Sequence, residues 1–215
     1  LAGPEIGVAS TKAFTAQLAV LALFGLHIQQ QNNDIEKNVF ISLFSIHESI
    51  KKILNDFKRF EEIAHSLRDA KSIFYIGRGI MYPIALEGAL KLKEITYKHC
   101  EGYAAGELKH GPLALIEDQI PVIALAPSDH NFSKMLSNIQ EVRARGGKSI
   151  IITDKAGSVK AKKYCDQIIV LPSTNYLTSA IIYSLPIQLI AYHLAVLLGT
   201  DVDQPRNLAK SVTVE

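Results

Sequence analysis

Cysteine is scarce in this chain, which holds only Cys100 and Cys165 in 215 residues. Their positions match none of the spacings used by zinc sites or redox motifs, so a disulfide-stapled or zinc-bound fold is not indicated. Two structural thiols in a reducing compartment are the simpler interpretation. The sequence therefore predicts a cytoplasmic protein with no bound metal.

An excess of charge of either sign is also lacking, since the formal net charge is +2 and the Lys and Arg residues are scattered. Nucleic-acid and anionic-membrane binders carry clustered positive charge, so neither partner is expected. No GxxxxGK[ST] motif occurs, which argues against a nucleotide hydrolase. The chain starts at Leu1 with no basic segment before an apolar run, so we predict no signal peptide and expect the start to lie inside a domain.

Two apolar stretches, residues 13–28 and 179–199, approach the length of about 20 residues that crosses a bilayer. The second contains Pro186, Gln188 and His193, which are poorly suited to lipid. We predict that both stretches are helices buried in protein, and that the second one is bent at its proline. No membrane association is expected.

The remaining pattern is that of an α/β protein with a doubly wound parallel sheet flanked by helices. Short β-rich runs, separated by helical segments, imply crossover connections and a parallel sheet, whose ligands bind at the carboxyl ends of the strands. The predicted strands cover residues 72–76, 121–126, 149–153 and 167–171. The predicted helices start near residues 10, 41, 59, 81 and 132, and Ser10 or Thr11 is a candidate cap for the first.

The helix predicted to start near residue 81 carries the first group of candidate catalytic residues. Glu87, Lys91 and Glu94 are four and three residues apart, so they share one helix face. Taken alone, such a stripe is more often solvated. The apolar residues around it favour a partly buried position, where a carboxylate beside an ammonium can serve as a base that removes a carbon-bound proton.

Two further features are weak by themselves. His110 lies in a predicted loop before Gly111 and Pro112, and a histidine can exchange protons near neutral pH, although most loop histidines are surface residues. Gly77-Arg78-Gly79 separates a strand from a helix and has the composition of a phosphate-binding turn, without the full dinucleotide fingerprint.

Three segments together carry a specific resemblance. Residues 3–14 (GPEIGVASTKAF), 77–112 and 199–215 (GTDVDQPRNLAKSVTVE) resemble the glutamine–fructose-6-phosphate aminotransferases (isomerizing), or glucosamine-6-phosphate synthases. The resemblance covers essentially the whole chain. It implies a flavodoxin-like three-layer αβα fold made of sugar isomerase (SIS) domains. It also implies a homodimer, the substrate fructose-6-phosphate, the product glucosamine-6-phosphate and no cofactor.

The resemblance assigns domains and residues. Residues 1–33 match the end of a first SIS domain, 34–69 connecting helices, 70–199 the second SIS domain and 200–215 a tail that closes the active site over the sheet's ligand edge. A glutaminase domain and a phosphate-gripping loop are expected upstream. The resemblance implies that Glu94 is the base that moves a proton between C1 and C2 and that Lys91 assists it. It implies that Lys210 forms an imine with the sugar, and that His110 opens the sugar ring from the neighbouring subunit. The implied sugar-lining residues are Val8, Ser10 and Ala209.

Two other functions stay open on the sequence alone. SIS domains also act as sugar-phosphate sensors in regulators, which need the ligand cradle but not the base, imine lysine and histidine. A related deaminase or amino-sugar deglycase is the other alternative, and the sequence of the tail argues against it. The tail is expected to dock because Leu208, Val212 and Val214 are apolar, whereas disordered tails are poor in such residues.

Overall fold

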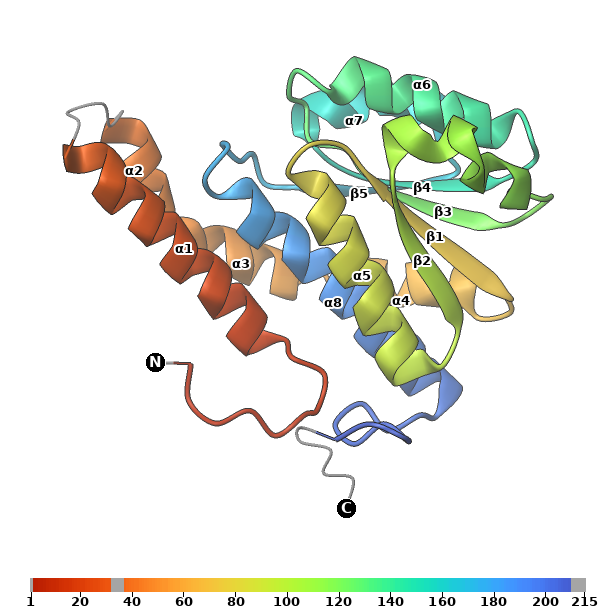
Figure 1. Cartoon of the computed structure of the whole chain (residues 1–215), viewed down its shortest axis with the longest axis horizontal. Helices are drawn as coiled ribbons and strands as arrows, with labels where there is room; N and C mark the ends of the chain where they lie inside the picture. Colours follow the sequence, from red (N-terminus) through yellow and green to blue (C-terminus); the bar gives the residue numbers. More distant parts are fainter. Residues whose placement is uncertain (1, 32–36, 210–215) are drawn as a thin grey trace.

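A five-stranded parallel sheet forms the centre of the protein (Figure 1), whose computed structural model describes residues 2–31 and 37–209. The strand order is β2-β1-β3-β4-β5, and every neighbouring pair is parallel. This order is that of a doubly wound sheet, so the predicted fold class is confirmed. The strands are β1 (Ser72–Gly77), β2 (His99–Ala104), β3 (Pro121–Leu125), β4 (Lys148–Asp154) and β5 (Gln167–Leu171).

Both faces of the sheet are buried, as expected for parallel strands with helical crossovers. In β1, Ile73 and Tyr75 point into one hydrophobic cluster, while Phe74 and Ile76 point into another on the opposite face. Each of these four side chains is at most 2% exposed. The run therefore reads as continuously apolar in the sequence, because neither face contacts water.

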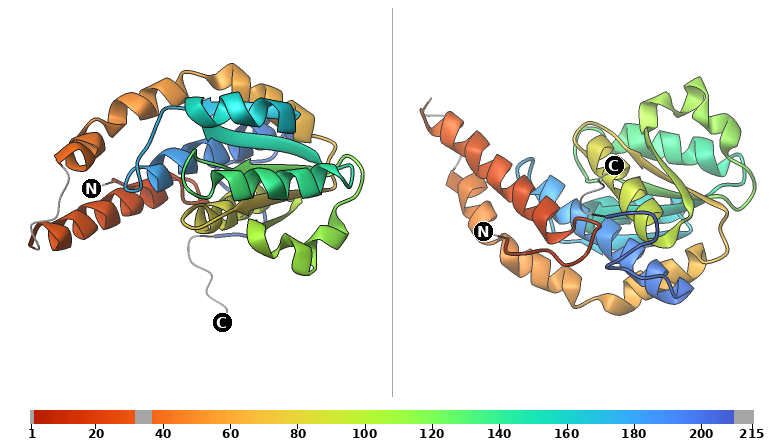
Figure 2. Two further views of the ribbon diagram at one scale, coloured as in Figure 1. Left: turned by 90° about the horizontal axis from the view of Figure 1, so that it is seen from above. Right: turned by 60° about the horizontal axis from the view of Figure 1, so that its bottom comes forward.

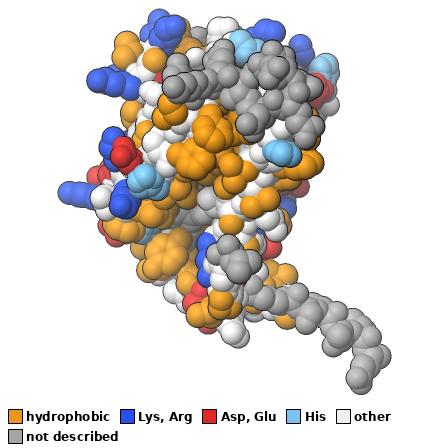
Figure 3. Space-filling model, turned by 90° about the vertical axis from the view of Figure 1, so that its left-hand side faces the viewer, with side chains coloured by type: hydrophobic (Ala, Val, Ile, Leu, Met, Phe, Trp, Pro, Cys, Tyr) orange, Lys and Arg blue, Asp and Glu red, His pale blue; other side chains and the backbone are white. Residues whose placement is uncertain are grey.

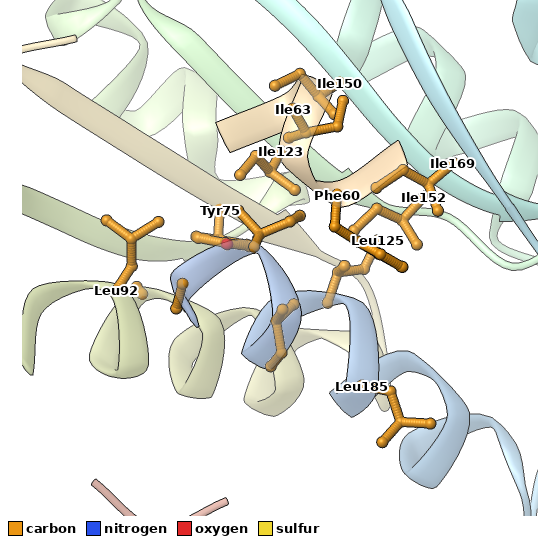
Figure 4. Close-up of a cluster of buried hydrophobic side chains, with 14 of the residues drawn as sticks. Phe60, Ile63, Tyr75, Leu92, Ile123, Leu125, Ile150, Ile152, Ile169 and Leu185 are labelled. Carbon is orange, nitrogen blue, oxygen red and sulfur yellow. The ribbon is translucent and has the colours of Figure 1, made fainter. Parts of the chain in front are cut away.

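Helices cover the two faces in separate layers. The first face packs against α4 (Phe57–Leu67), α5 (Met81–Thr96) and α8 (Ser179–Leu198), and Figure 4 shows the side chains that fill this interface. The second face packs against α6 (Phe132–Arg143), α7 (Lys155–Ala161) and two short 3₁₀ helices at Ala105–His110 and Pro112–Leu115; a third, Lys162–Tyr164, follows α7. The result is a three-layer αβα domain.

The long apolar helix α8 is one of these covering helices. By length and apolarity it could cross a membrane, yet 61% of its most apolar window is buried inside the protein. It packs against α5 and α4, and Pro186 lies within it. The prediction of a helix buried in protein is confirmed here.

The same prediction for residues 13–28 is not met by the part of the protein that the structure describes. These residues lie in α1 (Lys12–Gln31), which leaves Val20, Leu21 and Phe24 each at least 60% exposed. The helix carries apolar residues on all sides, but within the described residues only one side packs against α8 and α2 (Lys37–Phe44), through the cluster around Leu26. Figure 3 shows the hydrophobic side chains gathered on this side of the molecule.

Other boundaries also differ from those predicted. Where one helix was predicted to start near residue 41, the structure has two helices, α2 and α3 (Ile46–Leu54), with Ser45 between them. Strand β2 was not predicted, because its sequence His-Cys-Glu-Gly-Tyr-Ala has neither an apolar run nor clear alternation. It is an edge strand that pairs with β1 and with no other described strand. Polar residues are tolerated in such a strand because its outer edge is not covered by another strand.

Candidate functional site

Helix α5 positions the candidate catalytic side chains. It starts four residues after Gly77, where the chain turns so sharply that a Cβ atom on residue 77 would lie 2.1 Å from the Met81 carbonyl oxygen. It ends at Tyr97, which adopts the left-handed conformation (φ 61°) and donates its backbone N–H to the Lys93 carbonyl. The helix runs antiparallel to the strands, so its last turns lie at the amino-terminal edge of the sheet.

Lys91 lies between two carboxylates on this helix. Its Nζ atom is 2.6 Å from Glu94 Oε2 and 3.5 Å from Glu87 Oε1. The three side chains are 5%, 22% and 13% exposed, in the order Lys91, Glu94, Glu87. The solvated-stripe alternative is therefore wrong, because the stripe is largely withdrawn from water.

The electrostatics of the cluster favour a shared cation. Burial raises the pKa of Glu87; the Lys91 ammonium opposes this effect, and the Glu94 carboxylate adds to it. Two carboxylates this close would repel each other without the ammonium between them. Lys91 donates to Oε2 of Glu94 and leaves the second oxygen of that carboxylate free of this hydrogen bond.

The N-terminal segment lies beside this cluster. Val8 donates its backbone N–H to the Asp203 carbonyl, at 2.7 Å, which joins this segment to the tail. Ser10 is half-buried, and its hydroxyl donates to Glu5 Oε2. Glu5 also accepts the backbone N–H of Thr11 through Oε1, so a carboxylate from outside the helix serves the start of α1, instead of the expected Ser10 or Thr11 side chain.

The tail docks at the same edge. Thr200 donates its hydroxyl to the Ile95 carbonyl at the end of α5, and Asp201 Oδ1 accepts the N–H groups of Asp203 and Gln204. Ala209 is exposed. Lys210 lies outside the described residues, as do Val212 and Val214. Residues 200–206 thus dock on the domain, but not through the apolar side chains from which docking was predicted, since Leu208 is 43% exposed and the two valines are not described.

A cavity of about 310 Å³ lies where these parts meet, within the size range of small-molecule sites. It is bounded by the N-terminal segment, α5, α8 and the tail. The right-hand view of Figure 2 shows how the ribbons of these four parts are arranged. Lys91, Gln188, Tyr192 and Asp203 are the polar or amphipathic side chains that line it from the folded core and tail. Of the predicted site residues, Lys91 lines the cavity, Glu94 is paired with Lys91, and Val8 and Ser10 flank the lining residue Ala9.

His110 lies far from that neighbourhood in the same chain. It is exposed and ends the 3₁₀ helix that follows β2, whereas Glu94 precedes β2. A strand of six residues at about 3.3 Å each puts the two groups on the order of 15–20 Å apart, at opposite edges of the sheet. One chain therefore does not unite them.

The carboxyl edge of the sheet holds a different cavity, of about 500 Å³, lined among others by Asp129, His130 and Asp154. The expectation that the tail covers this edge is wrong, because α8 runs back from it and delivers the tail to the opposite one. The Gly77-Arg78-Gly79 turn serves packing here: Arg78 Nη1 donates to Asn138 Oδ1 on α6, at 2.7 Å.

Within the described residues, no group of three or more His, Cys, Asp or Glu side chains is arranged to hold a metal ion. Cys100 is buried, and burial raises its pKa to about 12, while Cys165 is half-buried; both thiols are free. The residues that sequence reasoning left without a role are Glu87, Glu5 and Tyr97. The spacing placed Glu87 on the same helix face as Lys91 without giving it a role. Glu5 contacts Ser10 and Thr11, close by in the chain, whereas Tyr97 contacts the distant Arg206.

Comparison with known proteins agrees with the fold. Residues 66–198 match the SIS domain family. Over its whole length the chain is 53% identical to glutamine–fructose-6-phosphate aminotransferase (isomerizing) of Zymomonas mobilis and 56% identical to that of Bartonella quintana. Both relatives are enzymes by name, and the chain spans 36% of the length of each.

Solved structures give the same result. The C-terminal domain of glucosamine-fructose-6-phosphate aminotransferase from Francisella tularensis has a TM-score of 0.87 at 43% identity, over 94% of this chain and 58% of that one. The sugar isomerase domain of an RpiR transcription factor from Sphaerobacter thermophilus, at 16% identity, TM-score 0.62 and coverage of 75% and 90%, shares the fold alone. The resemblance drawn from the sequence is confirmed, and the chain belongs to the SIS domain family.

Proposed function

We propose that the chain is the isomerase half of an enzyme that converts fructose-6-phosphate and glutamine-derived ammonia into glucosamine-6-phosphate. The observation that carries this proposal is the partly buried Lys91–Glu94 pair beside a docked tail. A sugar sensor has no use for a carboxylate poised in this way. The names of the close relatives support the same substrates.

In this mechanism His110 first opens the sugar ring by proton exchange with the ring oxygen. The Lys210 amine then attacks the C2 carbonyl and expels water, which forms an imine. Ammonia adds to the imine carbon and releases the lysine amine. Glu94 takes a proton from C1 of the resulting imine and returns it to C2, while the C1 hydroxyl proton passes to the nitrogen. This leaves an amine at C2 and an aldehyde at C1, with no external oxidant or reductant.

His110 acts from a neighbouring copy in this proposal. Its separation from Glu94 within one chain supports that arrangement, since a two-fold dimer places the same residue from each copy at the other's site. The protein is accordingly a homodimer. Cytoplasmic reducing conditions suit the two free thiols.

The proposed domain division follows from the surface of α1. Residues 1–33 are the end of a first SIS domain, whose remaining part covers the exposed Val20, Leu21 and Phe24. That part also supplies the loop that grips the sugar phosphate, and a glutaminase domain supplies ammonia. The chain alone is therefore inactive even with ammonia present, and clear turnover of fructose-6-phosphate by it would contradict this division.

Glu94→Gln tests the function in the protein expressed from its whole coding sequence. The amide keeps the size of the side chain but does not accept the proton, so fructose-6-phosphate still binds while deuterium uptake at C1 from deuterated water falls at least about 100-fold. Glu87→Gln is the matched control, with exchange within about tenfold of the unmodified protein. If Glu94→Gln exchanges at the normal rate, Glu94 is not the base.

Binding without exchange in the unmodified protein would instead favour the regulatory module. Such a module binds the sugar phosphate through its cradle and performs no proton transfer. The same deuterium measurement on the unmodified protein thus separates the two functions.

A further inference from the structure

Tyr97 joins the end of α5 to the tail by two contacts with one residue. The Arg206 backbone N–H donates to the Tyr97 hydroxyl oxygen, at 2.8 Å. The Arg206 guanidinium lies over the Tyr97 ring, with its central carbon 4.2 Å from the ring centre. These two contacts are called the Tyr97–Arg206 anchor below.

The backbone of Tyr97 adopts a conformation that is unusual for a tyrosine. A helix usually ends in the left-handed conformation with glycine, because a Cβ atom makes that conformation unfavourable. Tyr97 has φ 61° and ψ 12°. The turn itself is held without the tail, since Tyr97 N–H bonds to Lys93 and the Lys98 ammonium bonds to the Ala70 carbonyl.

The anchor fixes the tail close to the candidate base. Tyr97 follows Glu94 by three residues, and Thr200 bonds to Ile95 in the same turn. Pro205 is buried beside the anchor. Lys210 follows Arg206 by four positions, a stretch that spans at most about 14 Å when fully extended.

We propose that Tyr97 is a positioning residue that holds the tail, through Arg206, within reach of the site containing Glu94. The anchoring of the tail stands on the contacts above, whereas its purpose, presenting Lys210 to the sugar, rests on the proposed function. No substrate contact is assigned to Tyr97. Its effect is transmitted through the tail.

Hydrogen exchange of tail amides tests the anchor without any assay of activity. Tyr97→Phe removes the acceptor and keeps the ring, whereas Tyr97→Gly removes both and suits the left-handed turn. Arg206→Gln removes the cation and keeps the backbone donor. We expect exchange of residues 204–209 to rise about tenfold in Tyr97→Phe and Arg206→Gln and further in Tyr97→Gly, with α5 amides unchanged. Tyr176→Phe, at an exposed tyrosine elsewhere, is the control.

The positioning role is tested by borohydride trapping of the imine at saturating fructose-6-phosphate. We expect Tyr97→Gly to lower the trapped fraction several-fold, with partial recovery in Tyr97→Phe. Unchanged tail exchange in all three variants overturns the anchor. Faster exchange with normal trapping overturns the positioning role. If the unmodified protein traps no imine, the proposed function fails, while the exchange data still decide whether the anchor exists.

Discussion

The Lys91 ammonium lies 2.6 Å from the Glu94 carboxylate and 3.5 Å from that of Glu87, with only 5% of the lysine side chain exposed. Burying an ammonium together with two carboxylates costs solvation free energy, because each charge must be removed from water. Its retention at the edge where the tail docks agrees with a chemical role for the cluster.

Replacing Lys91 with Met keeps an unbranched side chain, one atom shorter, and removes its charge. Glu87 and Glu94 are then left facing each other, so we expect a loss of about 3 kcal/mol in unfolding free energy and a rise in the pKa of at least one carboxyl. Product formation should fall at least about 100-fold. Denaturant unfolding and initial rates provide the measurements, with Lys93→Met, an exposed lysine on the same helix, as the control. A Lys91→Met variant as stable and active as the control would show that the ion pair is incidental.

The separation of His110 from Glu94 makes a quantitative prediction about mixed dimers. Glu94→Gln and His110→Gln variants should each be nearly inactive. When the two are unfolded together and reassembled, half of the dimers are mixed, and each mixed dimer contains one intact site, so activity should return to about a quarter of normal.

The same mixing of Glu94→Gln with Lys91→Met provides the control, because both substitutions fall in one chain's part of the site and restore nothing. Failure of the first mixture to regain activity, with mixed dimers demonstrated by mass spectrometry, would exclude His110 as a contribution from the partner.

His193 on α8 predicts a pH dependence of stability. Burial lowers its pKa, although Glu61 Oε1 lies 4.0 Å from Nδ1 and opposes the shift. The rings of Phe57 and Tyr192 also face it. The unfolded chain then binds the proton more tightly than the folded one, so stability should fall as the pH drops below about 6.5.

Thermal unfolding at pH 7.5 and 5.5 measures this effect. The decrease in melting temperature should be smaller in His193→Gln and unaltered in His65→Gln, which changes an exposed histidine on α4. An equal decrease in all three proteins would assign the acid sensitivity to other groups.

Gly88 marks the closest approach of α5 to its neighbours. A Cβ atom there would lie 2.9 Å from Tyr75 Cε1 and 3.1 Å from Ile187 Cγ2. Gly88→Ala should therefore destabilise the fold by about 1–3 kcal/mol, despite the better helix propensity of alanine. Gly25→Ala, where nothing lies within 4 Å of the added atom, should instead stabilise α1 by about 0.5–1 kcal/mol. Calorimetric melting temperatures that move in the same direction for both variants would contradict this account of the packing.

The sequence predicted the sheet well where burial was complete. Four of the five strands were predicted correctly because short apolar runs, such as residues 167–171, are typical of the buried strands of a parallel sheet. Strand β2 was missed since its polar edge sequence carries no such signal, and the burial of residues 13–28 was overestimated, because composition does not show which helix has neighbours.

The candidate site was predictable only in part. Glu87, Lys91 and Glu94 share a face through helical spacing, which is local information. The edge of the sheet at which the tail docks follows from the direction of α8, and the contact between Tyr97 and Arg206 joins residues 109 positions apart in the chain. Neither property is encoded in short-range patterns.

The imine at Lys210 tests the proposed function most directly. The protein expressed from its whole coding sequence is incubated with fructose-6-phosphate and borohydride, and the modified peptide is mapped by mass spectrometry. The sugar adduct should lie on Lys210 and vanish in Lys210→Ala, while Lys93→Ala, which changes an exposed lysine near the site, traps the normal amount. An adduct that persists undiminished in Lys210→Ala would contradict the proposed mechanism.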